Sequence, residues 1–256
     1  MNSIDVENED IEVNGLRLVT GGDNSEALPV IEKQFVNFMF LRVNPEWRKL
    51  NSETKRIFKS EFQKIFNGFS EELLLFSYSL VGFDSKADLM FWRVGKSLDS
   101  IQDMTAKLYR TNLGGFLETV DNYLSVTGKM MFVKPEPNED HDDRFQIAAG
   151  EKRYHFLYPC AKHSDWYAKT DKEREDLIKE NFMVGKKFEN IKIHMTHAFG
   201  FSEQEYIISF ETDEPRDFLA LAEELRQTPA SKLTLCGMPI YTCRLRSLSE
   251  CLDSLG

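Results

Sequence analysis

The two halves of this 256-residue chain follow one plan, and that repetition limits the folds open to it. A stretch that begins Gly82-Phe83 and continues into an apolar segment reappears about 118 positions later as Gly200-Phe201. Trp47 and Trp166, each just before a helical pattern, are separated by a similar offset. Solenoid repeats have periods of only about 20–50 residues. The sequence therefore predicts two fused copies of one α/β unit, in which specialised chemistry should show as a difference between the copies.

Each half also shows the same order of apolar patterns and helix caps. The spacing predicts β-α-β-β-α-β twice, which is the ferredoxin-like order. The expected fold class is α+β, a tandem duplication of the dimeric α+β barrel type with helices on the outer faces of two antiparallel sheets. The expected strands are 35–43, 73–81, 88–94 and 120–126, then 153–158, 191–199, 205–211 and 234–244; the expected helices are 51–66, 97–110, 170–188 and 214–226.

Composition shifts set the expected domain boundaries. Residues 1–30 are polar and contain paired glycines, which is typical of an arm with little core. The segment 128–152 contains two prolines and an acidic cluster and is interpreted as a linker loop. The first repeat then covers 31–127, the second covers 153–246, and 247–256 is expected to be a C-terminal tail.

Charge and cysteine usage exclude several classes of protein. The net charge of −10 argues against a nucleic-acid partner, which needs clustered Lys and Arg. No apolar run reaches the ~18 residues of a membrane span, and the acidic first residues do not resemble a signal peptide. The four cysteines have no metal-ligand spacing and are read as reduced thiols. We expect a cytoplasmic protein; an organelle is also compatible if a transit peptide has been removed.

Short motifs in a fixed order then indicate a family. Residues 158–162 read Y-P-C-A-K and fit the pattern Y-P-x-x-K, and 166–167 read W-Y. The helix end at 180–188 and the Gly200-Phe201 turn follow in the expected places. In this order the motifs resemble the chlorite dismutase family, which includes the coprohaem decarboxylases. The resemblance covers about residues 33–246.

The resemblance implies a homopentameric ring with haem or coprohaem in the second repeat. In the family, a histidine of the long helix binds the iron, and a Gln or Arg on the next strand faces the other side of the ring. The decarboxylases use the tyrosine of Y-P-x-x-K as a radical relay, helped by the lysine. Carried over, Tyr158 and Lys162 are the candidate catalytic residues, and Trp166 and Tyr167 are candidate cofactor-binding residues.

The chain departs from the family at the iron. Asn181 stands at the position of the histidine, on the helix stripe that also carries Val184. An amide oxygen suits hard ions such as magnesium better than iron. Lys186 replaces the family's Arg and keeps its charge without the forked geometry. No metal site is predicted from the His194/His197 pair, because strand residues at this spacing point to opposite faces.

The distal side of the expected ring depends on strand register. Alignment on Gly200 places Ile193 there, whereas alignment without a gap places His194 there; a one-residue slip reverses the faces. We favour Ile193, because deletion of a loop residue is the simpler event. His197 shares the face of Ile193 and is a candidate replacement ligand.

Two classes of function remain at this stage. One is a divergent tetrapyrrole-pocket protein whose haem chemistry is weakened or lost, which could be a structural oligomer, a ligand carrier or a binder of another tetrapyrrole through Asn181. The other is an active haem-dependent peroxidase or coprohaem decarboxylase that uses Tyr158 and Lys162. A structural interpretation of that pair is also open, in which Tyr158 packs its ring and Lys162 is a solvated loop residue.

Overall fold

The chain divides into two compact units, Met1–Ile31 and Glu32–Gly256. The structure, a computed structural model, describes residues 12–13, 16–17, 33–128, 150, 152–201, 203–236 and 239–256. In the first unit β1 (Glu12–Val13) pairs antiparallel with β2 (Leu16–Arg17). The rest of the arm expected at 1–30, and almost all of the linker expected at 128–152, lie outside the described residues.

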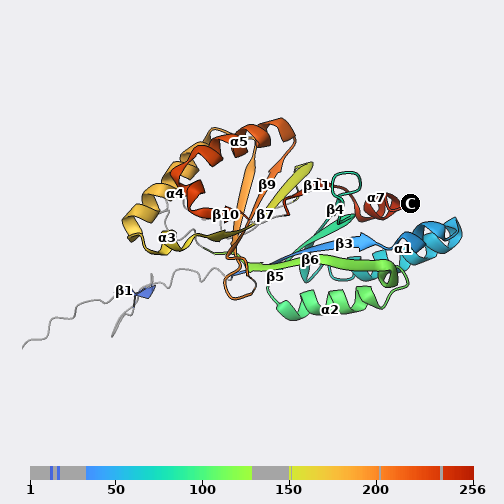
Figure 1. Cartoon of the computed structure of the whole chain (residues 1–256). Coiled ribbons are helices and arrows are strands. Elements are labelled where there is room, and N and C mark those ends of the chain that lie inside the picture. Colours follow the sequence, from blue (N-terminus) through green and yellow to red (C-terminus); the bar gives the residue numbers. More distant parts are fainter. Residues whose placement is uncertain are drawn as a thin grey trace, which may run out of the picture. The chain divides into compact units, whose positions relative to one another are not determined.

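The first half of the larger unit contains one four-stranded antiparallel sheet in the order β4-β5-β3-β6. Two long helices and two short 3-10 helices connect its strands (Figure 1). The elements are β3 (Phe35–Val43), η1 (Pro45–Lys49), α1 (Ser52–Asn67), β4 (Leu73–Ser79), β5 (Leu89–Gly95), α2 (Leu98–Tyr109), η2 (Gly114–Phe116) and β6 (Leu117–Val126).

The second half repeats this strand order, with its last strand divided in two. β7 lies between β9 on one side and β10 and β11 on the other, and β8 follows β9. The elements are β7 (Tyr154–Lys162), α3 (Ser164–Tyr167), α4 (Asp171–Lys186), β8 (Lys192–His197), β9 (Tyr206–Thr212), α5 (Pro215–Gln227), α6 (Pro229–Lys232), β10 (Thr234–Cys236), β11 (Tyr241–Leu245) and α7 (Leu248–Asp253). In each half the strands and the long helices therefore follow one another in the order β-α-β-β-α-β.

The repeated Gly-Phe motif forms the same turn twice. Gly82 follows β4 with φ of 81°, and Gly200 follows β8 with φ of 79°. Backbone in this left-handed region strongly favours glycine, because a Cβ is strained there. The phenylalanines that follow, Phe83 and Phe201, are both exposed. The sequence repeat thus reflects a shared backbone requirement.

Two pairings join the sheets into a closed ring of strands. β11 pairs with β4 through Arg244 and Ser79, and β6 pairs with β8 through Val126 and His197. The interior of this ring is a continuous buried core, whose largest member is Trp92. Both edge strands of the first sheet, β4 and β6, are therefore paired with strands of the second sheet.

The helices cover the outer faces of the two sheets (Figure 1). α1, α2 and α7 pack on the first sheet around a core that includes Phe62 and Phe91. α4 and α5 cover the second sheet around a smaller core that includes Phe156, Phe210 and Phe218. Three apolar layers therefore follow one another: helix–sheet, ring interior and sheet–helix.

Local capping explains where the long helices begin. Asn51 accepts a hydrogen bond from the backbone N–H of Thr54, and Ser97 caps α2 in the same way through Asp99. Thr170 and Glu173 form a capping box at the start of α4. These side chains satisfy N–H groups that have no partner within the helix. The helix starts expected from the sequence at these caps are confirmed.

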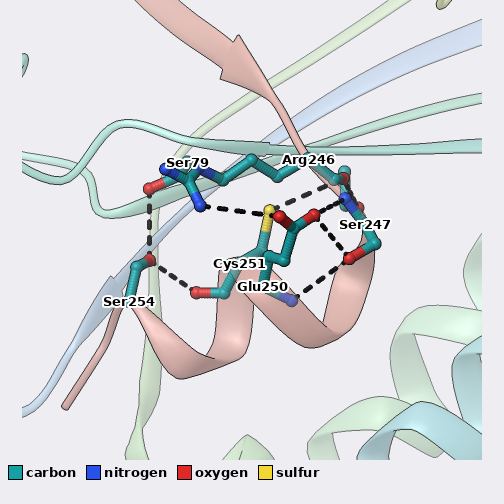
Figure 2. Close-up of polar contacts among 7 residues, drawn as sticks. Ser79, Arg246, Ser247, Glu250, Cys251 and Ser254 are labelled. Carbon is teal, nitrogen blue, oxygen red and sulfur yellow. Dashed lines mark hydrogen bonds and ion pairs between the residues drawn. The ribbon is translucent and has the colours of Figure 1, made fainter.

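The segment 247–256, expected to be a tail, contains α7 and packs on the first sheet. Figure 2 shows the capping box of Ser247 and Glu250, and the contact of the Ser254 hydroxyl with that of Ser79, 3.1 Å apart. Leu252 and Leu255 are buried in the core beneath α1. The last residues are thus part of the folded core of the first half.

Pro159 does not end a strand, contrary to the expected strand 153–158. β7 continues to Lys162 because β9 pairs with it along almost its whole length. On the opposite side, β11 pairs with β7 up to Leu157 and β10 begins to pair at Cys160. Pro159 therefore lies where the neighbouring strand is interrupted, a position that tolerates a residue without an N–H.

Candidate functional site

The candidate site lies on the face of the second sheet that α4 and α5 cover. Side chains alternate along β7, so Phe156, Tyr158, Cys160 and Lys162 face the helices, whereas Leu157 faces the ring interior. The strand thus presents the two expected catalytic side chains on one face, with Cys160 between them.

Tyr158 is held in an aromatic cluster. Its ring lies edge-on to Phe210, with centroids 5.7 Å apart, and tilted against Phe218 at 5.9 Å. Burial, reinforced by the nearby Cys236, raises the pKa of Tyr158 to about 12. Tyr158 is therefore a neutral phenol at physiological pH, and its ring packs as the structural interpretation expects.

Lys162 is not the solvated loop residue of that interpretation. It ends β7, and its Nζ donates a hydrogen bond of 2.8 Å to Oγ1 of Thr234 on β10. The same Nζ lies 4.4 Å from the ring centroid of Trp166, a cation–π contact. Burial lowers the pKa of Lys162 below its ordinary value. The ammonium is thus fixed by two contacts at the end of the strand.

Trp166 and Tyr167 form half of the short helix α3. Trp166 is buried and supports Lys162, while Tyr167 keeps 47% of its surface exposed. Burial and a hydrogen bond with Glu205 raise the pKa of Tyr167. Oε2 of Glu205 also accepts a 2.8 Å hydrogen bond from the backbone N–H of Lys162. Glu205 therefore connects the W-Y motif to the end of β7.

Asn181 lies on the stripe of α4 that faces the sheet. Val184, one turn further along, and Phe188, just after the helix, pack in the same core as Tyr158. The Oδ1 atom of Asn181 is buried and has no hydrogen-bond partner among the described residues. A buried amide oxygen without a partner is costly, by roughly 1–3 kcal/mol. The side chain at the family's iron-binding position is thus an unsatisfied oxygen acceptor.

Strand β8 places Ile193 and His194 on opposite faces. Ile193 lies on the helix side, because a Cβ added at Gly185 of α4 would lie 3.2 Å from its Cδ1 atom. His194 points into the ring interior, where its Nε2 lies 3.1 Å from Oε2 of Glu211. The structure therefore has the register in which Ile193 faces the candidate site.

The two remaining candidate residues, Lys186 and His197, lie on other elements than Tyr158. Lys186 is exposed near the end of α4, with its Nζ 4.7 Å from the ring centroid of Phe182. His197 is at the far end of β8, where its ring lies 5.5 Å from that of Tyr206. A Cβ at Gly128 would lie within 2.7 Å of the His197 ring, so the chain just after β6 closes over this histidine. The structure brings Lys162 and Trp166 into contact, and Tyr158 lies four residues earlier on the same face of β7, whereas Lys186 is on α4 and His197 is on β8.

The residues present do not fit a haem held by the long helix. The donor position carries an amide, whereas haem iron takes imidazole, thiolate, thioether or phenolate ligands. A Cβ added at Gly185 would lie only 3.2 Å from Cδ1 of Ile193, whereas a flat ring between helix and strand needs about 3.5–4 Å on each of its faces. The apolar surroundings themselves suit a macrocycle, since Tyr158, Val184 and Phe188 line this layer.

Sequence reasoning missed the residues that β10 contributes. Thr234 and Cys236 are register partners of Lys162 and Cys160, and β10 is a strand of three residues. Nothing in the sequence marks this pairing, because a break separates β10 from β11, which pairs with the same strand.

A second polar group lies inside the ring of strands. The side chain of Glu211 is fully buried, and its Oε1 accepts hydrogen bonds from the N–H of Gly150, at 3.0 Å, and from Tyr78, at 3.4 Å. His155 is also fully buried, and neither ring nitrogen has a partner among the described residues. In the part of the chain that the structure describes, no three His, Cys, Asp or Glu side chains gather as metal ligands. The described helices include none that is long and apolar enough to cross a membrane.

Comparison with known proteins gives a consistent result. The model of the chlorite dismutase family matches residues 36–246. A coproheme decarboxylase from Mycolicibacterium smegmatis is 25% identical over 166 residues, covering 64% of this chain and 70% of that protein. One from Oceanobacillus iheyensis is 26% identical over 196 residues, covering 70% and 78%. A chlorite dismutase from Ideonella dechloratans is 22% identical over 204 residues, covering 77% and 71%.

Solved structures share the fold. Chlorite dismutase from Candidatus Nitrospira defluvii in complex with imidazole has a TM-score of 0.78 at 24% identity, covering 86% of this chain and 94% of that chain. A heme-binding protein from Thermus thermophilus has a TM-score of 0.77 at 20% identity, covering 88% and 95%. Identities this low bear on the fold alone, whereas the family match spans most of the sequence. The chain therefore belongs to the chlorite dismutase family.

Proposed function

We propose that this chain is a divergent tetrapyrrole-pocket protein of its family that has lost haem chemistry through an axial histidine. The observation that supports the proposal is Asn181, whose buried Oδ1 is without a partner among the described residues. An amide oxygen is a weak ligand for iron and a better one for a hard ion such as magnesium. The layer between α4 and the sheet would then serve a carrier or structural role, or bind a tetrapyrrole whose metal accepts oxygen.

Titration with haem and with coprohaem tests this proposal. Wild-type protein, Asn181→His and the matched control Asn181→Ala are each titrated, and the Soret band is followed for stoichiometry and affinity. We expect saturable one-to-one binding at least tenfold tighter in Asn181→His than in either other protein, because imidazole supplies the missing donor. If wild-type protein binds as tightly as Asn181→His, the proposed loss is wrong.

A second candidate function is a haem-dependent peroxidase or coprohaem decarboxylase. Its support is the retained pair Tyr158 and Lys162, together with relatives named coproheme decarboxylase. The geometry is compatible with both roles: Nζ of Lys162 holds a proton beside Thr234, and Tyr158 presents a half-buried neutral phenol. Tetrapyrrole iron, when bound, supplies the oxidising chemistry, which the side chains alone cannot.

Product analysis separates the two candidates. Protein is mixed with coprohaem and hydrogen peroxide, and decarboxylated product is measured by chromatography. Activity in wild type that falls at least a hundredfold in Tyr158→Phe, with Lys162→Met as a second variant, would favour the enzyme. Equal turnover in wild type and Tyr158→Phe would exclude the tyrosine relay.

We also propose that the chain assembles as a homopentamer, the assembly that the resemblance to the family implies. Exposed apolar side chains on the larger unit, among them Leu74, Val81, Leu219 and Leu235, support burial of further surface between copies. Light scattering should then give a mass near five times the 29.7 kDa of one chain. A monodisperse peak at one subunit mass would exclude it.

A further inference from the structure

Two cysteines face each other across the sheet beside the candidate site. Cys160 on β7 and Cys236 on β10 are direct register partners in an antiparallel pair. Their sulfur atoms lie 3.1 Å apart. A disulfide has an S–S length of about 2.05 Å, and opposed residues of antiparallel strands have Cα separations of about 4.5–5.5 Å, within the range a disulfide needs. Bridging therefore requires the sulfur atoms to approach by only about 1 Å, without moving the strands.

The two thiols are not equivalent. Cys160 is buried, and its Sγ donates a hydrogen bond to Sγ of Cys236, which is exposed. This hydrogen bond, with the positive charges of Lys162 and Arg226, outweighs burial and lowers the pKa of Cys236. The same hydrogen bond raises the pKa of Cys160. Cys236 is therefore the thiol that ionises first, and Cys160 stays protonated beside it.

Lys162 lies two register positions from Cys160 in the same strand pair, on the same face of the sheet. Its partner in register is Thr234, two residues before Cys236, and its Nζ is fixed on the Thr234 hydroxyl at 2.8 Å. The nearby positive charge of the Lys162 ammonium stabilises the Cys236 thiolate. The charge that activates Cys236 is thus anchored by the strand ladder itself.

The other two cysteines lack these features. Cys243 and Cys251 are both fully buried, in the ring interior and beneath α1 respectively. Burial raises the pKa of each. A buried protonated thiol is a poor nucleophile, because the thiolate is the reactive form. The chain therefore contains one activated and exposed thiol with one adjacent partner.

We propose that Cys236 is a peroxide-reactive thiol and that Cys160 resolves it to an intramolecular disulfide. The Cys236 thiolate attacks one oxygen of hydrogen peroxide, which breaks the O–O bond, gives a sulfenic acid and releases hydroxide. The Cys160 sulfur then attacks the sulfenic sulfur; its proton and the departing hydroxyl leave as water. In total two thiols lose two electrons and two protons, and one peroxide is reduced to two waters. No metal or tetrapyrrole takes part, so the inference is independent of the proposed function.

Oxidation would change the candidate site directly. The disulfide removes the hydrogen bond between the two sulfur atoms and fixes β10 to β7 between Tyr158 and Lys162. The Cys160 thiol also lies 3.8 Å from the carbonyl oxygen of Tyr158. Oxidation by peroxide at this face of the sheet would therefore alter the surroundings of Tyr158 and Lys162.

Thiol counting on the full-length protein tests the proposal. Reduced, desalted protein without added tetrapyrrole is treated with hydrogen peroxide under anaerobic conditions, then denatured and alkylated. We expect intact mass to show two of the four cysteines unalkylated and a loss of two hydrogens, with no change in the monomer band on a non-reducing gel. Peptide mapping should assign the link to Cys160 and Cys236, and dithiothreitol should restore four alkylated cysteines.

Three variants separate the roles of the two sulfurs. Cys160→Ser keeps a hydrogen-bond donor but cannot resolve, so dimedone should trap a sulfenic acid on Cys236. Cys160→Ala lacks the donor as well, so its reaction with peroxide should shift to a higher pH than in Cys160→Ser. Cys251→Ala is the matched control and should form the bridge at the wild-type rate.

Two results would overturn the proposal. One is a wild-type protein in which all four cysteines remain alkylatable after a peroxide dose that oxidises free cysteine completely. The other is a disulfide that forms between chains or involves Cys243 or Cys251. If the serine variant fails to fold, the peptide map of wild-type protein still decides between these outcomes.

Discussion

The buried histidine inside the ring of strands should make the protein acid-sensitive by a calculable amount. His155 is edge-on to Phe38, Tyr78 and Trp92, with centroids 4.7–5.9 Å away, and Cys243 is its register partner on β11. Burial lowers the pKa of His155 from 6.5 to about 3, although the nearby Glu211 charge opposes this and His194 adds to it. The folded protein therefore keeps His155 neutral at pH values where the unfolded chain protonates it.

The sign and size follow from linkage. Because the unfolded state binds more protons between the two pKa values, the contribution of His155 is fully present above 6.5 and is lost as the pH falls toward 3. At pH 5 protonation of the unfolded chain lowers the free energy of unfolding by about 2 kcal/mol relative to pH 8. Burial alone would raise the pKa of Glu211, but the hydrogen bonds from His194 and from the N–H of Gly150 outweigh it and lower this pKa from 4.5. The stability that ionised Glu211 contributes is present above pH 4.5 and is lost only as the pH falls below that value. The measurement at pH 5 is therefore above the range in which Glu211 titrates.

Urea unfolding at pH 8 and pH 5 measures this contribution. Wild-type protein should lose about 2 kcal/mol more between the two pH values than His155→Leu does, since leucine cannot ionise. His163→Asn is the matched control: it removes a histidine whose side chain is 47% exposed and keeps a favourable cap for α3. The loss of stability that His155 causes between the two pH values should persist in this variant. Identical pH dependence in wild type and His155→Leu would refute the reasoning.

Three further predictions concern stability. Deletion of 247–256 should lower the free energy of unfolding by about 5 kcal/mol in a urea titration, because three buried apolar side chains of α7 and its end lose their packing; an unchanged midpoint would show that α7 is dispensable. Asn37→Ala should lower the free energy of unfolding by about 3 kcal/mol, because Asn37 Oδ1 accepts two hydrogen bonds from the buried Arg93 guanidinium. A near-neutral effect would mean that Arg93 finds another acceptor. Thr170→Ala should cost about 1 kcal/mol and Thr170→Ser almost nothing by the same assay, since serine keeps the α4 cap; equal losses would contradict a capping role.

The sequence was informative wherever the signal was local. The expected helices began at Asn51, Ser97 and Thr170, and each of these residues accepts the hydrogen bond from the first turn that defines a cap. The Gly82 and Gly200 turns could be matched because both need the same left-handed backbone. Such features depend on a few consecutive residues, and the rest of the fold does not alter them.

Features that depend on distant partners could not be predicted in the same way. Gly237 and Pro239 predict an interruption of the strand at 234–244, but Pro159 lies inside β7 because that gap falls beside it, and nothing next to Pro159 shows this. His155 is buried because the two sheets close into a ring, and no local sequence pattern shows this. The opposition of Cys160 and Cys236 has the same origin. Pairing register is set by the whole sheet, so the candidate site needed the structure.

The difference between the two halves is concentrated on the helix that carries Asn181. α1 buries Phe62 and Phe66 against the first sheet, whereas α4, its counterpart, fully buries none of its described residues. Displacing α4 or rotating Ile193, which is 39% exposed, therefore costs little compared with the same change at α1. The missing donor, rather than the contact with Ile193, should then limit haem binding. Ile193→Ala alone should therefore give the same Soret titration as wild-type protein. In the double variant, Ile193→Ala should increase the affinity for haem by a smaller factor than Asn181→His alone does. A large gain from Ile193→Ala alone would show that packing, and not ligand chemistry, excludes the ring.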